Sequence, residues 1–226
     1  MSHLHIPDGV LPIWLVILGW AVIIGGIALT THIADDTEHR QRIPFVGSVA
    51  ALMLVAMSAE IMPLEYHVNL TVFAGALLGP LLSVPVALIV AAILAFLGHG
   101  GITVTGLNAT IFAFEMVLGG TLLRIGRQHV RKDSLGKLAG GVSLLTLAAS
   151  TALTVGIVAC GGVHKMMGFT MVAFGLGTIG WLIEAAVTSA IVTFIARVRP
   201  SLLMPDPTEE PHMPQSGDSQ TMGAKR

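Results

Sequence analysis

Long apolar stretches without charge are the feature that most limits the folds open to this chain. The first runs from Val10 to Thr31 and contains no charged residue. It is long enough to cross a bilayer, which takes about 20 apolar residues. Only 11% of the 226 residues are charged, whereas a soluble domain carries about 25%. Because lipid offers no partner to a free backbone N–H or C=O, these stretches are predicted to be helices of an all-α, polytopic membrane protein.

Seven such segments, separated by polar breaks, predict a bundle of about seven transmembrane helices. The third is short for a span, so it could tilt, be re-entrant or lean on its neighbours. Residues 1–199 are predicted to form the membrane domain, and residues 200–226, rich in proline and polar residues, a disordered tail. The segments are Val10–Thr31, Pro44–Pro63, Val68–Gly79, Leu81–Leu97, Thr103–Arg124, Leu138–Cys160 and Phe169–Ala196.

The basic residues predict the direction of the chain, because Lys and Arg accumulate in cytoplasmic loops. With seven spans, alternate loops fall on opposite sides, and Lys165 stands alone on one side. The N-terminus is therefore predicted to lie outside and the tail in the cytoplasm, in the cell (inner) membrane. The eleven basic residues of the cytoplasmic side are Arg40, Arg42, Arg124, Arg127, Arg131, Lys132, Lys137, Arg197, Arg199, Lys225 and Arg226.

Five of the nine histidines then fall at or near the outer face. Imidazole is the commonest metal ligand in proteins and suits nickel, copper, zinc and cobalt. If the loops that carry these histidines converge, they form a metal site at the outer end of the bundle. The alternative is that each is an interfacial side chain hydrogen-bonded to a loop carbonyl. The five are His3, His5, His67, His99 and His164.

The N-terminal peptide has a chelating chemistry of its own. With Met1 retained, the amine, two amides and the His3 imidazole could hold one ion in a plane of four nitrogens. If Met1 is removed, the amine, one amide and the imidazole remain, which leaves a position for another histidine. Square-planar nitrogen ligands favour Ni(II) or Cu(II) over zinc.

Two acidic residues, Glu115 and Glu184, fall in the middle of predicted spans. Ionisable groups inside a membrane are costly, and they are usually functional or paired. They indicate either a cation path or proton relay, or structural carboxylates that are hydrogen-bonded between helices. Glu65 lies two residues before His67 and is a candidate extra metal ligand or a partner that orients the imidazole.

A glycine-rich outer turn, Gly98–Thr103, leads into the fifth segment. Thr103, Thr105 and Asn108 could line a polar pocket there, although ordinary helix packing is the alternative. The chain contains no G-x-x-x-x-G-K-[ST] phosphate loop. Any ATP-driven transport would therefore need a nucleotide site on another subunit.

Three blocks of this sequence resemble the substrate-capture membrane subunits of nickel/cobalt energy-coupling-factor (ECF) transporters, the cobalt-transport permease family associated with cobalamin biosynthesis. His5–Leu11 resembles that family's His-Ile-x-(Asp/Glu)-Gly-x-Leu. His67 and Gly79–Pro80 resemble its His…Leu-Leu-Gly-Pro at the same spacing. Gly100–Thr103 with Gly106–Asn108 is similar to its Gly-Gly-Ile-Thr…Gly-x-Asn. The blocks fall within residues 5–125, whereas the last two spans are similar only in hydropathy.

The resemblance implies a helical bundle that captures Ni(II) or Co(II) from outside as a transported substrate, with no permanent cofactor and no catalysis. In the family, the ion is held by the N-terminal amine, by the amide and imidazole of the second residue, and by a histidine before the third span. The two histidines match His5 and His67 here. The implied partners are a transmembrane coupling subunit, cytoplasmic ATPase subunits and membrane lipid, and no nucleic acid.

Three departures from the family pattern bear on the metal. The family histidine is second in its chain, whereas His5 is fifth, so the amine is displaced by three residues. Either His3 replaces it in the chelate, or the mature N-terminus differs, or the coordination has changed. The family's Ser-Gly before the second histidine is Glu65-Tyr66 here, which adds a carboxylate and bulk. The glycine pair that follows that histidine is Leu70-Thr71. The choice between nickel and cobalt therefore stays open.

Two other functions remain as alternatives at this point. One is a stand-alone membrane metal transporter or sensor that uses Glu115 and Glu184 for proton coupling. The other is a membrane metalloenzyme that activates a water with the outer histidines and Glu65. The sequence contains no H-E-x-x-H motif, which counts against this second alternative.

Overall fold

The computed structural model describes residues 6–33, 36–58, 67–162 and 164–203, and these residues are helical with short connections and no strand. Met1, His3, His5 and Glu65 therefore lie outside the described residues, as does the tail from residue 204 onward. The helices are α1 (Ile13–Ile33), α2 (Asp36–Ser58), α3 (Thr71–Phe96), α4 (Thr105–Arg127), α5 (Leu135–Cys160), α6 (His164–Val198) and the short α7 (Pro200–Leu203), with a 3-10 turn at Lys132–Ser134.

Five of these helices contain a stretch long and apolar enough to cross a membrane. They are α1, α3, α4, α5 and the Gly177–Val198 part of α6, while α2 contributes the shorter apolar stretch Pro44–Ser58. The surface of α1 fits this assignment, because most of its apolar side chains point away from the bundle and Ile13 is 72% exposed. A wide apolar surface of this kind suits lipid. The chain is therefore a multi-pass membrane protein.

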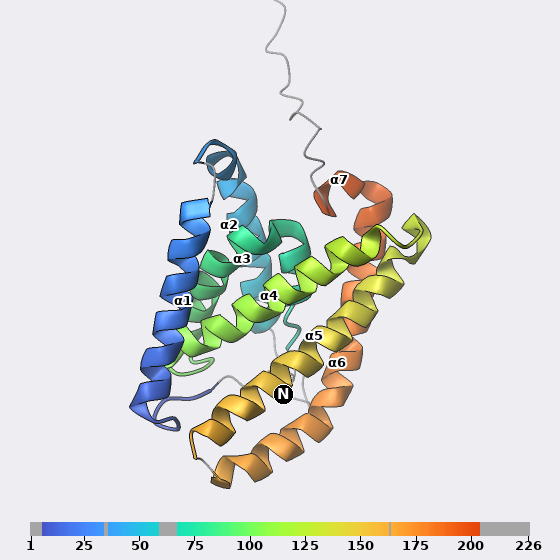
Figure 1. Ribbon diagram of the computed structural model, residues 1–226. Coiled ribbons are helices and arrows are strands. Elements are labelled where there is room, and N and C mark those ends of the chain that lie inside the picture. Colours follow the sequence, from blue (N-terminus) through green and yellow to red (C-terminus); the bar gives the residue numbers. More distant parts are fainter. Residues whose placement is uncertain (1–5, 34–35, 59–66, 163, 204–226) are drawn as a thin grey trace, which may run out of the picture.

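The third and fourth predicted segments form one element, α3, which is sharply broken at Gly79. Gly79 has φ 72° and ψ 174°, a conformation that glycine adopts at little cost because it has no Cβ. Pro80 follows and has no N–H to continue a hydrogen-bond ladder. The two parts, residues 71–78 and 80–96, fold back on one another as a hook (Figure 1).

The first part of α3 lies against the C-terminal half of α4. Its first residue, Thr71, is hydrogen-bonded to Glu115, and its end at Gly79 lies beside Arg124. Glu115 is ten residues from the start of the 23-residue α4, or about 15 Å along a helix of about 34 Å. Helix α3 therefore begins near the middle of the bundle rather than at one of its ends.

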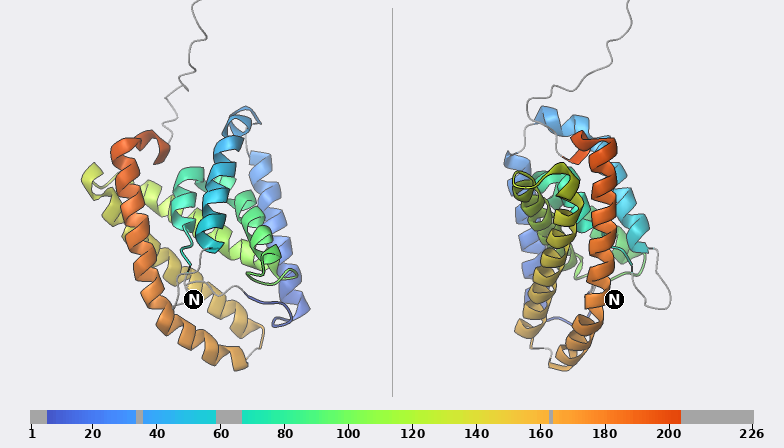
Figure 2. Two further views of the ribbon diagram at one scale, coloured as in Figure 1. Left: turned by 180° about the vertical axis from the view of Figure 1, so that it is seen from behind. Right: turned by 90° about the vertical axis from the view of Figure 1, so that its right-hand side faces the viewer.

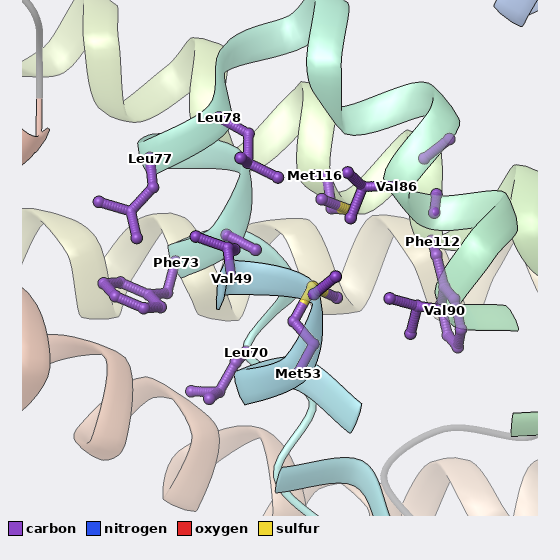
Figure 3. Close-up of a cluster of buried hydrophobic side chains, with 14 of the residues drawn as sticks. Val49, Met53, Leu70, Phe73, Leu77, Leu78, Val86, Val90, Phe112 and Met116 are labelled. Atoms are coloured by element: carbon purple, nitrogen blue, oxygen red, sulfur yellow. The ribbon is translucent and has the colours of Figure 1, made fainter. Parts of the chain in front are cut away.

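Side chains from α2, α3 and α4 form the main core (Figure 3). Met53 of α2 and Met116 of α4 are fully buried there, with Phe73 and Val86 of α3 around them. The close fit depends on a small residue, since a Cβ on Gly75 would lie 1.9 Å from the carbonyl oxygen of Met116. The backbones of α3 and α4 are thus in direct contact.

Helices α5 and α6 form a second unit, an antiparallel pair that lies side by side (Figures 1 and 2). Helix α4 packs against α1 and α3 on one side and against α5 on the other, and so joins the pair to the rest. This central place explains why more than half of α4 is buried.

We expect Gly75→Ala to lower the free energy of unfolding by about 1–3 kcal/mol, because the added methyl group overpacks the α3–α4 contact. The matched control is Gly156→Ala in α5, where a Cβ meets nothing within 4 Å. Thermal unfolding of both purified variants in detergent checks this. Equal unfolding temperatures for the two variants would contradict the close backbone contact.

Candidate functional site

The segment ahead of α1, residues 6–12, is here called the N-terminal segment, and its backbone is bound to the connection between α3 and α4. The Ile6 N–H donates to Asn108 Oδ1 at 3.2 Å, and Asn108 Nδ2 donates back to the Ile6 carbonyl at 3.2 Å. The Gly101 N–H donates to the same carbonyl at 3.1 Å. One amide side chain thus satisfies both backbone groups of Ile6, the residue that directly follows His5.

Asp8 makes the second attachment of this segment. Its carboxylate accepts the N–H groups of Ile102 and Thr103, both at 2.9 Å, and the Thr103 hydroxyl at 2.5 Å. The Thr103 hydroxyl, with smaller help from the backbone N–H groups of residues 102–104, holds the pKa of Asp8 below its usual value of 3.8 against a partial loss of solvation. A Cβ on Gly101 would lie 2.3 Å from Asp8 Oδ1, so only glycine leaves room for the carboxylate.

His99 is positioned by the end of α3. The Gly98 N–H donates to Ala95 and the His99 N–H donates to Leu94, and Gly98 has φ 85°. This is a Schellman motif, in which a left-handed glycine closes the helix and its last carbonyls are satisfied. His99 thus stands two residues before Gly101, which holds Ile6.

The imidazoles of His67 and His99 face each other edge to face, with ring centroids 6.1 Å apart and an interplanar angle of 89°. His67 is buried and His99 is half-buried. The described ranges contain no cluster of three or more His, Cys, Asp or Glu that could hold a metal ion. Two imidazoles from different parts of the chain therefore meet beside the anchored N-terminal segment, and Met1, His3, His5 and Glu65 are not among the described residues.

The backbone just after His67 is held by a carboxylate from α6. Glu184 Oε2 accepts the Asn69 N–H at 2.9 Å, and Glu184 Oε1 accepts the Leu70 N–H at 2.8 Å. Leu70 has φ 55°, the left-handed conformation that a branched side chain rarely adopts. Glu184 therefore caps the start of α3 in the middle of the bundle.

The same segment is held by Glu115 of α4 through side chains. Glu115 Oε2 accepts Asn69 Nδ2 at 2.7 Å and the Thr71 hydroxyl at 2.8 Å. Its other oxygen accepts the hydroxyl of Ser150 on α5. Both intramembrane carboxylates thus accept hydrogen bonds from one short stretch of chain, residues 69–71.

Of the residues predicted from sequence, His67 and His99 lie together, and Thr103 and Asn108 bind the N-terminal segment. Glu115 and Glu184 lie deeper in the bundle, where they accept hydrogen bonds from residues 69–71, just after His67. The partners Asn69, Thr71, Ser150 and Asp8 were missed as site residues. Two sequence patterns point to these residues. Polar residues alternate after His67, and hydroxyl residues recur along one face of α5.

Comparison with known proteins gives two matches. Residues 5–202 match the CbiM family, described as the cobalt uptake substrate-specific transmembrane region. A relative from Haloquadratum walsbyi, named "Putative metal transport protein", is 31% identical over 206 residues, which cover 88% of this chain and 93% of the relative. No solved structure gives a significant match.

We expect Asp8→Asn to loosen the N-terminal segment, because an amide has one acceptor oxygen where three donors converge. The pKa of Asp8 is lowered in the folded chain, so its stabilising effect is complete above 3.8 and is lost as the pH falls through the lower folded value. The wild type should unfold at a higher temperature than the variant at about pH 7, and the two unfolding temperatures should converge toward about pH 3. A difference that stays constant over this range would contradict the assignment.

Proposed function

Because this chain belongs to the CbiM family of cobalt uptake substrate-specific transmembrane regions, and is thus a membrane component of metal uptake, we propose that it is the substrate-binding component of an ECF-type transporter. The proposed substrate is Ni(II) or Co(II). The observation that carries the proposal is the meeting of His67 and His99 beside the N-terminal segment that follows His5.

The proposed ligands are His67 and His5, completed by His3 and the amine of Met1. Ile6 is fixed by Asn108 and Gly101, and consecutive Cα atoms are about 3.8 Å apart. His5 directly precedes Ile6 in the chain, and Ile6 is bound to the turn that carries His99. Nitrogen ligands of this kind suit Ni(II) and Co(II).

We assign His99 and Glu65 to the surroundings of the ion, where they would orient ligands or add one. Thr103 and Asn108 support the site by fixing the peptide that carries His5 and His3. Hydrogen-bonded neighbours of this kind orient metal ligands and tune their affinity.

In the proposed arrangement the chain passes the inner membrane about seven times, with the N-terminus outside. Residues 1–199 form the capture domain, and residues 200–226 form a cytoplasmic tail that begins with α7. A transmembrane coupling subunit and cytoplasmic ATPase subunits supply the energy, since the chain has no phosphate loop. The metal is substrate only, with no permanent cofactor, no catalytic step and no nucleic acid partner.

We expect His67→Ala and His5→Ala each to abolish high-affinity binding of Ni(II) and Co(II), because each removes an imidazole ligand. Titration of the purified full chain with either metal measures this. The matched control is His129→Ala, which changes an exposed histidine beyond the C-terminal end of α4. Wild-type affinity in both ligand variants would refute the proposed site.

A second prediction concerns the amine. Extra residues placed before Met1 should weaken metal binding, since they move the amine away from the imidazoles. Side-chain coordination alone predicts no effect, so unchanged affinity in the extended chain would remove Met1 from the ligand set.

Cobalt uptake by cells separates the proposed transporter from a stand-alone one. Uptake should require co-expression of the coupling and ATPase subunits. Full uptake by this chain alone would favour a stand-alone transporter instead.

A further inference from the structure

We propose that Glu184 and Glu115 are positioning residues for the His67 imidazole. The two carboxylates hold residues 69–71 at the middle of the bundle, and through them they set where the imidazole meets the metal. The inference rests on the proposed function, because it takes His67 as a ligand of the captured ion.

The first step is the unusual place of this stretch of backbone. Asn69 and Leu70 precede α3 and are buried near the midpoint of α4, far from either end of the bundle. Residues ahead of a helix cannot donate their N–H groups within it. At membrane depth, non-helical backbone is tolerated only where other protein groups satisfy it. These two N–H groups therefore need acceptors from elsewhere in the chain.

Glu184 supplies both acceptors at once. Its two oxygens take the N–H groups of two consecutive residues, at 2.9 and 2.8 Å. A two-point bond fixes the orientation of the peptide as well as its distance from α6. Asn69 is only two residues from His67, so little freedom is left between the fixed peptide and the imidazole.

The backbone conformation at Leu70 depends on this bond. A non-glycine residue at φ 55° is strained, and such strain persists only when the surrounding structure enforces it. The enforcing contacts are the Leu70 N–H on Glu184 and the burial of the Leu70 side chain in the core shared by α2 and α3 (Figure 3). Loss of the carboxylate would release the left-handed turn and swing the chain that leads back to His67.

Glu115 adds a second hold from a different helix. It binds the Asn69 and Thr71 side chains, and Asn69 Nδ2 also donates to the Thr71 hydroxyl at 2.9 Å. Ser150 of α5 donates to the other oxygen of Glu115. Helices α4 and α6 therefore bind three residues next to a proposed metal ligand, and α5 holds the α4 carboxylate that does so. Metal affinity thereby depends on how these helices pack.

The sharpest test compares two identical changes on α5. Ser150→Ala removes a buried hydroxyl that bonds Glu115, whereas Ser143→Ala removes a buried hydroxyl whose oxygen has no hydrogen-bond partner among the described residues. In the purified full chain, Ser150→Ala should raise the dissociation constant for Ni(II) or Co(II) about 3- to 10-fold, as expected for one lost hydrogen bond. Ser143→Ala should leave it unchanged.

A stronger pair lies on α6. Glu184→Gln keeps the size of the side chain but places an amide donor against an N–H, and it should weaken binding about 10- to 100-fold, the usual cost of losing a group that orients a ligand. Thr188→Val, one turn further along, removes a buried hydroxyl whose oxygen has no hydrogen-bond partner in the described ranges and is the control. If Glu184→Gln is not recovered folded, the α5 pair decides.

The absorption bands of bound Ni(II) or Co(II) separate positioning from general stability, because they report ligand geometry. Shifted bands in Ser150→Ala and Glu184→Gln, with wild-type bands in both controls, support the proposal. Wild-type affinity and bands in both test variants, while His67→Ala abolishes binding, overturn the positioning role and leave the proposed function standing. Equal losses in test and control variants also overturn it. Absence of binding in the wild type refutes the proposed function, and the inference with it.

Discussion

A buried backbone N–H without an acceptor is the constraint on which the arrangement of this protein depends. The chain interrupts its helices near the middle of the bundle, and leaving one such group unpaired in an apolar environment costs roughly several kcal/mol. Two carboxylates remove that penalty. Glu184 accepts hydrogen bonds from the N–H groups of Asn69 and Leu70, and Glu115 accepts hydrogen bonds from the side chains of Asn69 and Thr71. The two acidic residues within apolar spans are thus hydrogen-bond partners of a buried helix start.

Polar side chains also satisfy free backbone groups where the N-terminal segment meets the α3–α4 connection. Asp8 accepts the N–H groups of Ile102 and Thr103, just ahead of α4, and Asn108 pairs with both backbone groups of Ile6. One support acts on the chain after His67 and the other on the chain after His5. Between them, the segments that carry the proposed ligands are attached to the ends or midpoints of long helices, which are the rigid parts of the molecule.

Several features were predictable because they depend on local chemistry. Hydropathy predicts an all-helical membrane protein, and five of the described helices are long and apolar enough to cross a membrane. The third predicted segment ends at Gly79, which is where α3 is broken. The short third segment, with its re-entrant or tilted alternative, corresponds to the first part of the hook. The order of the histidine and glycine blocks predicts the family that the comparison of residues 5–202 shows. The joining of the third and fourth segments into one element was not predicted, since the sequence marks a break and not how tightly the two parts fold back.

The partners of the two carboxylates could not be read from the sequence. Glu184 lies 115 residues from Asn69, and Glu115 lies 46 residues from it. Apolar length, charge and residue type are local properties, so they were enough to give the all-helical membrane character, the family and the residues capable of binding a metal. The facing pair His67 and His99, the attachment of residues 6–8 by Asp8 and Asn108, and the packing of α4, α5 and α6 behind His67 became visible only in the folded chain. These are contacts between distant parts of the chain, and they exist only once the helices pack.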